Sequence, residues 1–236
     1  MNDYNDSLIV AKREQFLDET QVGYLRFEQE ALRKKYLEYL ERAQSEAEMH
    51  YFFETNPIVL PGLCDLHNGP LGEVVISKLQ LSNEYVTDFA FISVNSANAQ
   101  ITLVEIESPT MQLFRDSDNL FTSKFNRTLQ QVRDWTLWIE QNATYVKDLF
   151  REIYFKGVFR HQRVVSRSII VAGRRREIQV NSQREKRWAG ISQQGGHVEV
   201  MSYDRLAETL SVNPVLLQEL ICRPRRYISQ ILRKRR

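Results

Sequence analysis

The 236-residue sequence predicts a mixed α/β fold, in which helices flank a central β-sheet and a helical arm precedes it. Three observations indicate this class. Apolar residues recur at near-helical spacing through most of residues 6–54, and no Gly or Pro interrupts Tyr24 to Thr55. Several runs rich in β-branched and aromatic residues follow. Residues 126–142 then return to helical spacing, so sheet and helix alternate along the chain.

The N-terminal run predicts one long helix that ends at Asn56-Pro57 and Pro61-Gly62, because proline and glycine stop helices. Its apolar positions are Leu25, Leu32, Tyr36, Tyr39 and Leu40. We interpret residues 1–44 as an exposed amphipathic arm. An apolar stripe of this kind needs a partner surface, so we expect a homo-oligomer formed through the arm.

The strands are expected at 72–81, 84–94 and 100–108, with "NSANA" as the turn that joins the last two into a hairpin. A short buried strand follows at 167–173. Residues 196–210 begin as a strand and continue as a helix, with Ser202 or Asp204 as its N-cap. These elements place one domain at 45–212. The remainder, 213–236, is expected to form a C-terminal helix and a basic tail.

Composition excludes several classes of protein. Hydrophobic residues make up 42% and charged residues 26%, which is the balance of a globular chain with a real core. No apolar stretch approaches the roughly eighteen residues that a membrane span requires, and the N-terminus lacks a signal-peptide pattern. The two cysteines form no CxxC, so neither a zinc site nor a disulfide scaffold is indicated. We therefore expect a cytoplasmic protein without membrane contact.

Charge is distributed unevenly along the chain. Residues 1–150 contain 13 Lys/Arg and 23 Asp/Glu, whereas residues 151–236 contain 19 and 7. Basic runs occur at 174–176, 223–226 and 233–236. A basic half of this kind indicates a polyanionic partner, and the alternative is a solvated surface with a basic tail.

Acidic side chains meet at one end of the predicted hairpin. If the turn closes around residues 96–99, Ala90 faces Glu105 and Asp88 faces Glu107. Three carboxylates this close repel one another, and burial increases the cost. The charge is offset if one residue is protonated, if Lys or Arg covers the cluster, or if a divalent cation binds. The alternative is a set of solvated carboxylates at the end of a sheet.

Among these alternatives, the surrounding residues favour a bound divalent cation. "DFAFISV" followed by "TLVEIESPT" resembles the PD-(D/E)xK nuclease core, in which an Asp on one strand precedes an acidic-x-Lys triplet on the next. With "HYFFETNPIVL" upstream, and "FNRTLQQVRDWTLWIE" and "SIIVAGRR…HVEVMSYDRL" downstream, the chain resembles the Shedu family of anti-phage defence nucleases over residues 45–210. The resemblance implies a restriction-endonuclease-like core that cuts DNA and uses Mg²⁺ (or Mn²⁺).

The resemblance also implies site residues. Asp88 and Glu105 match the metal-binding acids, and Gln131 matches a glutamine on the following helix. Glu107 occupies the position of the usual catalytic lysine, where it would be a general base or a further metal ligand. Glu48 matches a supporting acid on the first helix, although an ordinary solvated helix residue is an equal interpretation.

Because glutamate cannot supply positive charge, the missing cation would come from Lys124 or Arg127 near the start of the next helix. Arg174, Arg175 and Arg176 would neutralise DNA phosphates, unless they form only an exposed turn. Two functions follow. The first is a metal-dependent DNA endonuclease, and the second is a catalytically degenerate protein that binds nucleic acid or scaffolds an assembly without cutting.

Overall fold

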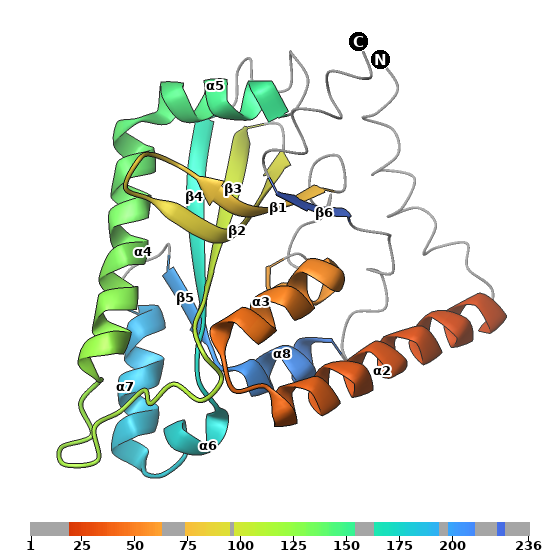
Figure 1. The fold of residues 1–236 in the computed structure, drawn as a ribbon, viewed down its shortest axis with the longest axis vertical. Coiled ribbons are helices and arrows are strands. Elements are labelled where there is room, and N and C mark those ends of the chain that lie inside the picture. The colour runs from red at the N-terminus through yellow and green to blue at the C-terminus, as the bar shows by residue number, and fades with distance from the viewer. Residues whose placement is uncertain are drawn as a thin grey trace.

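The computed structural model describes residues 19–62, 74–94, 97–153, 163–193, 198–210 and 221–224. Within them, six strands form one sheet in the order β5-β4-β3-β2-β1-β6 (Figure 1). The strands are β1 (Val74–Gln80), β2 (Val86–Val94), β3 (Asn98–Ile106), β4 (Arg163–Val171), β5 (Val198–Met201) and β6 (Ile221–Pro224). β1, β2 and β3 are antiparallel, whereas β4 and β5 continue the sheet in parallel with β3. The predicted mixed α/β class is confirmed.

Helices cover both faces of the sheet. On one face lie α4 (Ser123–Gln141), α5 (Ala143–Ile153) and α7 (Ser182–Gln193), whose apolar residues share a core with Ala90, Ile101 and Leu103. On the other lie α2 (Glu19–Arg42), α3 (Glu46–Thr55) and α8 (Tyr203–Thr209), which share a core with Phe89, Phe91 and Val104. The short helices η2 (Pro57–Val59) and α6 (Arg175–Ile178) complete the chain. Both faces of the central strands are therefore buried, as their apolar sequence predicts.

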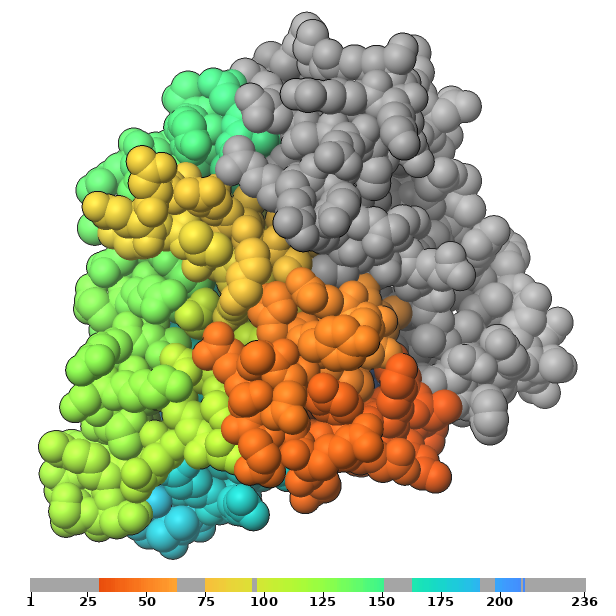
Figure 2. All heavy atoms as spheres, in the orientation of Figure 1, coloured from red at the N-terminus to blue at the C-terminus, as the bar shows by residue number. Residues whose placement is uncertain are grey.

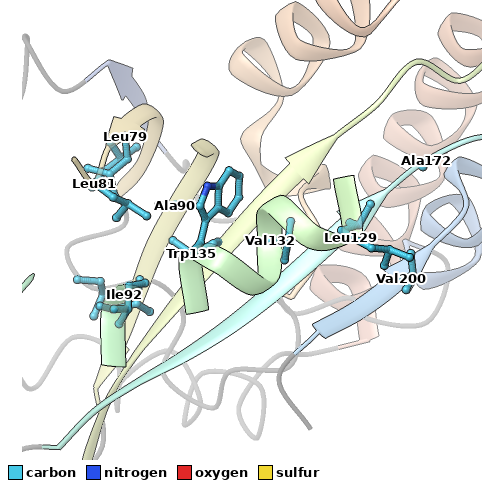
Figure 3. Packing of buried hydrophobic residues seen from close by; sticks show 14 of the residues in the cluster. Leu79, Leu81, Ala90, Ile92, Leu129, Val132, Trp135, Ala172 and Val200 are labelled. Carbon is cyan, nitrogen blue, oxygen red and sulfur yellow. The ribbon is translucent and has the colours of Figure 1, made fainter. Parts of the chain in front are cut away.

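Helix α4 shows how helical spacing builds this core. Leu129, Val132 and Trp135 recur every three residues and point toward the sheet, where they meet Ala90 and other strand residues (Figure 3). Trp135 and Val132 are fully buried. The exposed positions between them are polar for the most part, so α4 lies along the sheet with one apolar stripe inward.

The predicted single helix at 6–54 is wrong in one respect, because it breaks at residues 43–45. Ser45 caps α3 through a capping box with Glu48, in which each side chain accepts a hydrogen bond from the other residue's backbone N–H. This reciprocal cap starts a new helix in a new direction. Figure 2 shows the α2–α3 segment packed over the sheet, with α4 along one side.

The C-terminal half of α2 is not an exposed arm. Tyr36 and Leu40 are at most 1% exposed, and they pack in the core that α2 shares with α3 and α8. The Tyr36 hydroxyl donates a 2.8 Å hydrogen bond to the carbonyl of Tyr203. This part of the apolar stripe is therefore buried within the chain and needs no partner subunit to cover it. Residues 1–18 and the side chains before Glu30 lie outside the described part, so a homo-oligomer stays a prediction that rests on them.

The hairpin register differs from the predicted one by two residues. Ile92 pairs with Ile101, Ala90 with Leu103 and Phe89 with Val104. Continuing by one residue, Asp88 lies opposite Glu105 rather than Glu107. A shift of two preserves the alternation of faces, so the predicted faces hold while the predicted partners do not.

The C-terminal segment also differs from expectation. Residues 221–224, expected within a helix or tail, form β6, which pairs in parallel with β1. The rest of 213–236, including the basic run at 233–236, lies outside the described residues. Among the helices of the described chain, none combines the length and apolarity that a bilayer span requires.

Candidate functional site

Acidic side chains gather where β2 and β3 separate. Asp88, which is 4% exposed, turns its carboxylate toward β3, and its Oδ2 accepts a 2.8 Å hydrogen bond from the Ile106 N–H. The side chain thus takes the place of a main-chain acceptor at the end of the ladder. Because this bond fixes Asp88, the carboxylate is held beside the end of β3, which carries Glu105.

Glu105 receives a 3.0 Å hydrogen bond on Oε1 from Gln131 Nε2. Partial burial, the adjacent charge of Asp88 and a hydrogen bond to the Asp88 carboxylate raise the pKa of Glu105 to about 10. At neutral pH without a cation, Glu105 is therefore protonated and donates to Asp88.

Glu107 is held through both its main chain and its side chain. Its N–H donates to Val171 O at 2.9 Å, and its own carbonyl accepts from the Tyr203 hydroxyl at 2.5 Å. Its Oε1 accepts from Thr128 Oγ1 at 2.5 Å, and Oε2 lies 2.7 Å from Lys124 Nζ. Main chain and side chain are both fixed, so Glu107 presents its carboxylate in one orientation.

Helix α4 brings three of these partners to the cluster. Thr122 caps the helix by accepting from the Phe125 N–H, so the helix begins at Ser123, one residue before Lys124. Lys124, Thr128 and Gln131 then follow at intervals of four and three, so they share one face. The apolar stripe next to this face packs on the sheet, and therefore these side chains point at the ends of β2 and β3.

A fourth carboxylate comes from α3, and it is Glu46 rather than Glu48. Burial raises the pKa of Glu46, and the charges of Asp88 and Glu107 raise it further, which places Glu46 beside the cluster. Glu48 is exposed and its Oε2 accepts from the N–H groups of Gln44 and Ser45, which lowers its pKa. The structure therefore does not bring Glu48 to the other acids.

The position of Glu46 follows from two hydroxyl groups at the end of β3. Ser108 Oγ and Thr110 Oγ1 both donate to the carbonyl of Gln44, at 2.9 and 3.0 Å. They tie the α2–α3 connection to the segment that follows Glu107. Glu46, two residues after Gln44, is thereby held over the cluster.

Two further residues, missed by sequence reasoning, contact Asp88. Lys78 on β1 forms an ion pair with Asp88 Oδ1. His50 on α3 stacks on Phe89 at 4.5 Å, with Nε2 3.9 Å from Asp88 Oδ1. Burial lowers the pKa of His50, and the charge of Lys78 lowers it further, so the ring is neutral at neutral pH. Neither residue lies within the acidic motif, and only the pairing of β1 with β2 brings Lys78 there.

Within the described residues, the other predicted basic residues form no ion pair with the acids of the cluster. Arg127 is exposed on α4 and has no ion pair within the described residues. Arg174 pairs with Asp204 at 3.0 Å and with Glu41 at 2.7 Å, and Arg175 pairs with Glu208. Their charges are thus compensated within the chain. Of the triplet, Arg176 alone is exposed and has no ion pair in the described part.

The donor set fits Mg²⁺ or Mn²⁺ in its chemistry, because these ions take carboxylate and amide oxygens. In the described chain, no three His, Cys, Asp or Glu side chains already converge as a closed metal cage. Mg²⁺ does not need one, since it is commonly held by one or two carboxylates together with waters and substrate phosphates. Asp88 and Glu105 are two adjacent carboxyl groups of this kind, and burial and then the charge of Asp88 raise the pKa of Glu105.

The chain was compared with protein-family models and with curated proteins. Residues 43–207 match the family model described as Shedu protein SduA, C-terminal, and this range includes Glu46, Asp88, Glu105 and Glu107. No curated protein matches the chain. Because the family model spans most of the sequence, the chain belongs to the Shedu SduA C-terminal family, which implies a part in anti-phage defence.

Proposed function

We propose that this chain is a metal-dependent deoxyribonuclease of the PD-(D/E)xK type that hydrolyses DNA phosphodiester bonds in anti-phage defence. The observation that carries the proposal is the position of Asp88 and Glu105, which lie directly beyond the paired residues Phe89 and Val104 at the end of the β2–β3 ladder; burial and then the charge of Asp88 raise the pKa of Glu105 to about 10. A bound Mg²⁺ or Mn²⁺ would supply the Lewis acid that polarises a phosphate and acidifies water.

The remaining residues have roles that their contacts support. Asp88 and Glu105 would hold the cation, and Gln131 orients Glu105 through its 3.0 Å hydrogen bond. Glu107, fixed by Thr128 and Lys124, is placed to accept a proton from the attacking water. Lys124 also brings positive charge to a surface that must approach polyanionic DNA.

One observation favours the alternative, a nuclease-fold protein that binds nucleic acid without cutting it. Lys78 pairs with Asp88 and Lys124 pairs with Glu107, so lysines already offset part of the acidic charge. Glu107 also stands where the PD-(D/E)xK pattern has a lysine. A degenerate protein would bind DNA with the same affinity whether metal is present or not, and it would leave the DNA intact.

Nicking of supercoiled plasmid by the full chain separates the two functions. We expect cleavage in Mg²⁺ or Mn²⁺, none in EDTA, and none from Asp88→Asn or Glu105→Gln, which keep side-chain shape but cannot present a carboxylate to a cation. Glu140→Gln is the matched control, because Glu140 is an exposed acid on α4 outside the cluster. Cleavage in EDTA, or an active Glu105→Gln, would contradict the proposal.

A further inference from the structure

Strand β1 changes face at Lys78. Ile76 and Leu79, three residues apart, are both fully buried in the core on the α4 side. In an uninterrupted strand, residues three apart point to opposite faces. The change occurs at Lys78, whose φ is 50°. This value lies in the left-handed region, which residues other than glycine and asparagine rarely adopt.

The surroundings force this conformation on Lys78. Ser77 pairs with Phe89 and Leu79 pairs with Thr87, so Lys78 lies directly opposite Asp88. The buried side chains of Ile76 and Leu79 fix the backbone on either side. Strained residues of this kind persist only where neighbours over-determine them, and they concentrate at functional sites. Here the strain directs one ammonium group at one carboxylate.

Lys78 combines two properties that a substrate-binding cation requires. Its Nζ contacts Asp88 Oδ1 at the centre of the acidic cluster, while 51% of its side chain stays exposed. Solvent, and therefore a phosphodiester, can reach Lys78, whereas the Asp88 side chain is 5% exposed. Lys124, the other lysine of the site, already pairs with Glu107, which is placed to act on water.

The two lysines also differ in what a cation would do to them. A cation held by Asp88 and Glu105 competes with Lys78 for Asp88, because both need the same carboxylate oxygens. The released ammonium would stay tethered beside the cluster, next to the phosphate that the site must bind. Lys124 keeps its partner, since Glu107 is bound separately by Thr128.

We propose that Lys78 is a catalytic residue that contacts the scissile phosphate and stabilises its developing negative charge. It would supply from β1 the cation that Glu107 cannot supply from the end of β3. This inference rests on the proposed nuclease function and adds to it a residue outside the acidic motif.

The test compares Lys78→Gly, Lys78→Arg and the matched control Lys34→Ala in the full chain. Glycine suits a φ of 50°, so Lys78→Gly removes the ammonium without adding strain. Lys34 is an exposed lysine that pairs with Glu38 on α2, away from the site. Two quantities are measured, the single-turnover nicking rate at saturating Mn²⁺ and the affinity for Mn²⁺ by titration calorimetry.

We expect Lys78→Gly to lower the nicking rate by about 10²–10³-fold, the usual cost of removing one charge-stabilising group. Its Mn²⁺ affinity should equal or exceed that of the wild type, because no ammonium competes for Asp88. Lys78→Arg should recover much of the rate, and Lys34→Ala should change neither quantity.

The outcomes separate the two proposals. An active wild type with an equally active Lys78→Gly overturns the role of Lys78 and leaves the nuclease function standing. A Lys78→Gly variant that loses rate and Mn²⁺ affinity together also overturns it, because Lys78 would then only hold Asp88 in place. A wild type that binds Mn²⁺ but never cuts overturns both proposals.

Discussion

The replacement Glu105→Gln should stabilise the metal-free protein, and by an amount that grows with pH. In the folded chain, a protonated Glu105 donates to Asp88 and accepts from Gln131. Glutamine reproduces this pattern, because its Nε2 can donate to Asp88 while its Oε1 accepts from Gln131 Nε2. The variant therefore keeps both hydrogen bonds and no longer titrates.

The magnitude follows from the shifted pKa. The unfolded chain releases the Glu105 proton near its ordinary pKa of 4.5, whereas the folded chain keeps the proton until about pH 10. Between these values the folded state binds more protons, so the free energy of unfolding decreases as pH rises, by up to about 1.4 kcal/mol per pH unit. At about pH 7, the cost of keeping Glu105 protonated is roughly 3 kcal/mol. This figure is an upper bound, because solvent reaches the partly exposed side chain.

Calorimetric melting in EDTA at about pH 5 and pH 7.5 measures the effect. For a chain of this size, 3 kcal/mol corresponds to roughly 6–12 °C, so Glu105→Gln should melt several degrees above wild type at the higher pH. At the lower pH the difference should be small, under about 1 kcal/mol. Mn²⁺ should raise the wild-type melting temperature more than that of the variant, since the variant has lost a ligand.

Glu140→Gln again serves as the control, and its melting temperature should follow wild type at both values of pH. A Glu105→Gln variant that melts below wild type at both values would contradict the reasoning. So would a gain that is the same at both, because a shifted pKa must give a pH-dependent difference.

Two further predictions concern the basic residues and the N-terminus. Arg174→Ala should lower the free energy of unfolding by about 2 kcal/mol, because it removes the guanidinium that pairs with Asp204 and Glu41. Arg176→Ala should instead change the free energy of unfolding by less than about 0.5 kcal/mol and reduce the log–log slope of DNA affinity against salt by about 0.9. Equal effects of the two variants on DNA binding would contradict the assignment of Arg174 to stability and Arg176 to DNA binding. Removal of residues 1–29 should reduce the mass measured by light scattering while the domain stays folded, since buried Tyr36 and Leu40 are retained. A full chain that is already monomeric at micromolar concentration would refute the predicted oligomer.

The sequence predicts strands β1 to β5 and helix α4 well, because β-branched runs and three-residue apolar spacing are strong local patterns; β6, expected within a helix or tail, is the exception. Helix α7 was not predicted, since its sequence is largely polar and its few contacts with the core depend on the fold. The hairpin register was wrong by two residues because it depends on the geometry of the turn, which composition alone does not fix. The long N-terminal helix was predicted without its break, although Ser45 and Glu48 have the spacing of a capping box.

The acids were predicted together because one hairpin and the next helix carry them. Asp88, Glu105, Glu107 and Gln131 all lie within this short stretch of chain, so local pairing brings them into contact. Glu46 and Lys78 were missed because other elements carry them, α3 and β1, whose placement depends on packing across the sheet. Recognising the capping box would have assigned Glu48 to the helix cap and directed attention to Glu46.

Glu105 is the residue at which stability and the proposed activity oppose each other. If a carboxyl group serves only packing or a hydrogen bond, an uncharged replacement of the same shape is not expected to raise the free energy of unfolding. At Glu105 the same replacement is expected to raise stability and to abolish cleavage. The metal-free fold already offsets its acidic charge by protonating Glu105 and by pairing Lys78 with Asp88 and Lys124 with Glu107. Folding therefore does not need the cation, and a carboxyl group retained at the expense of stability is what a ligand for that cation requires.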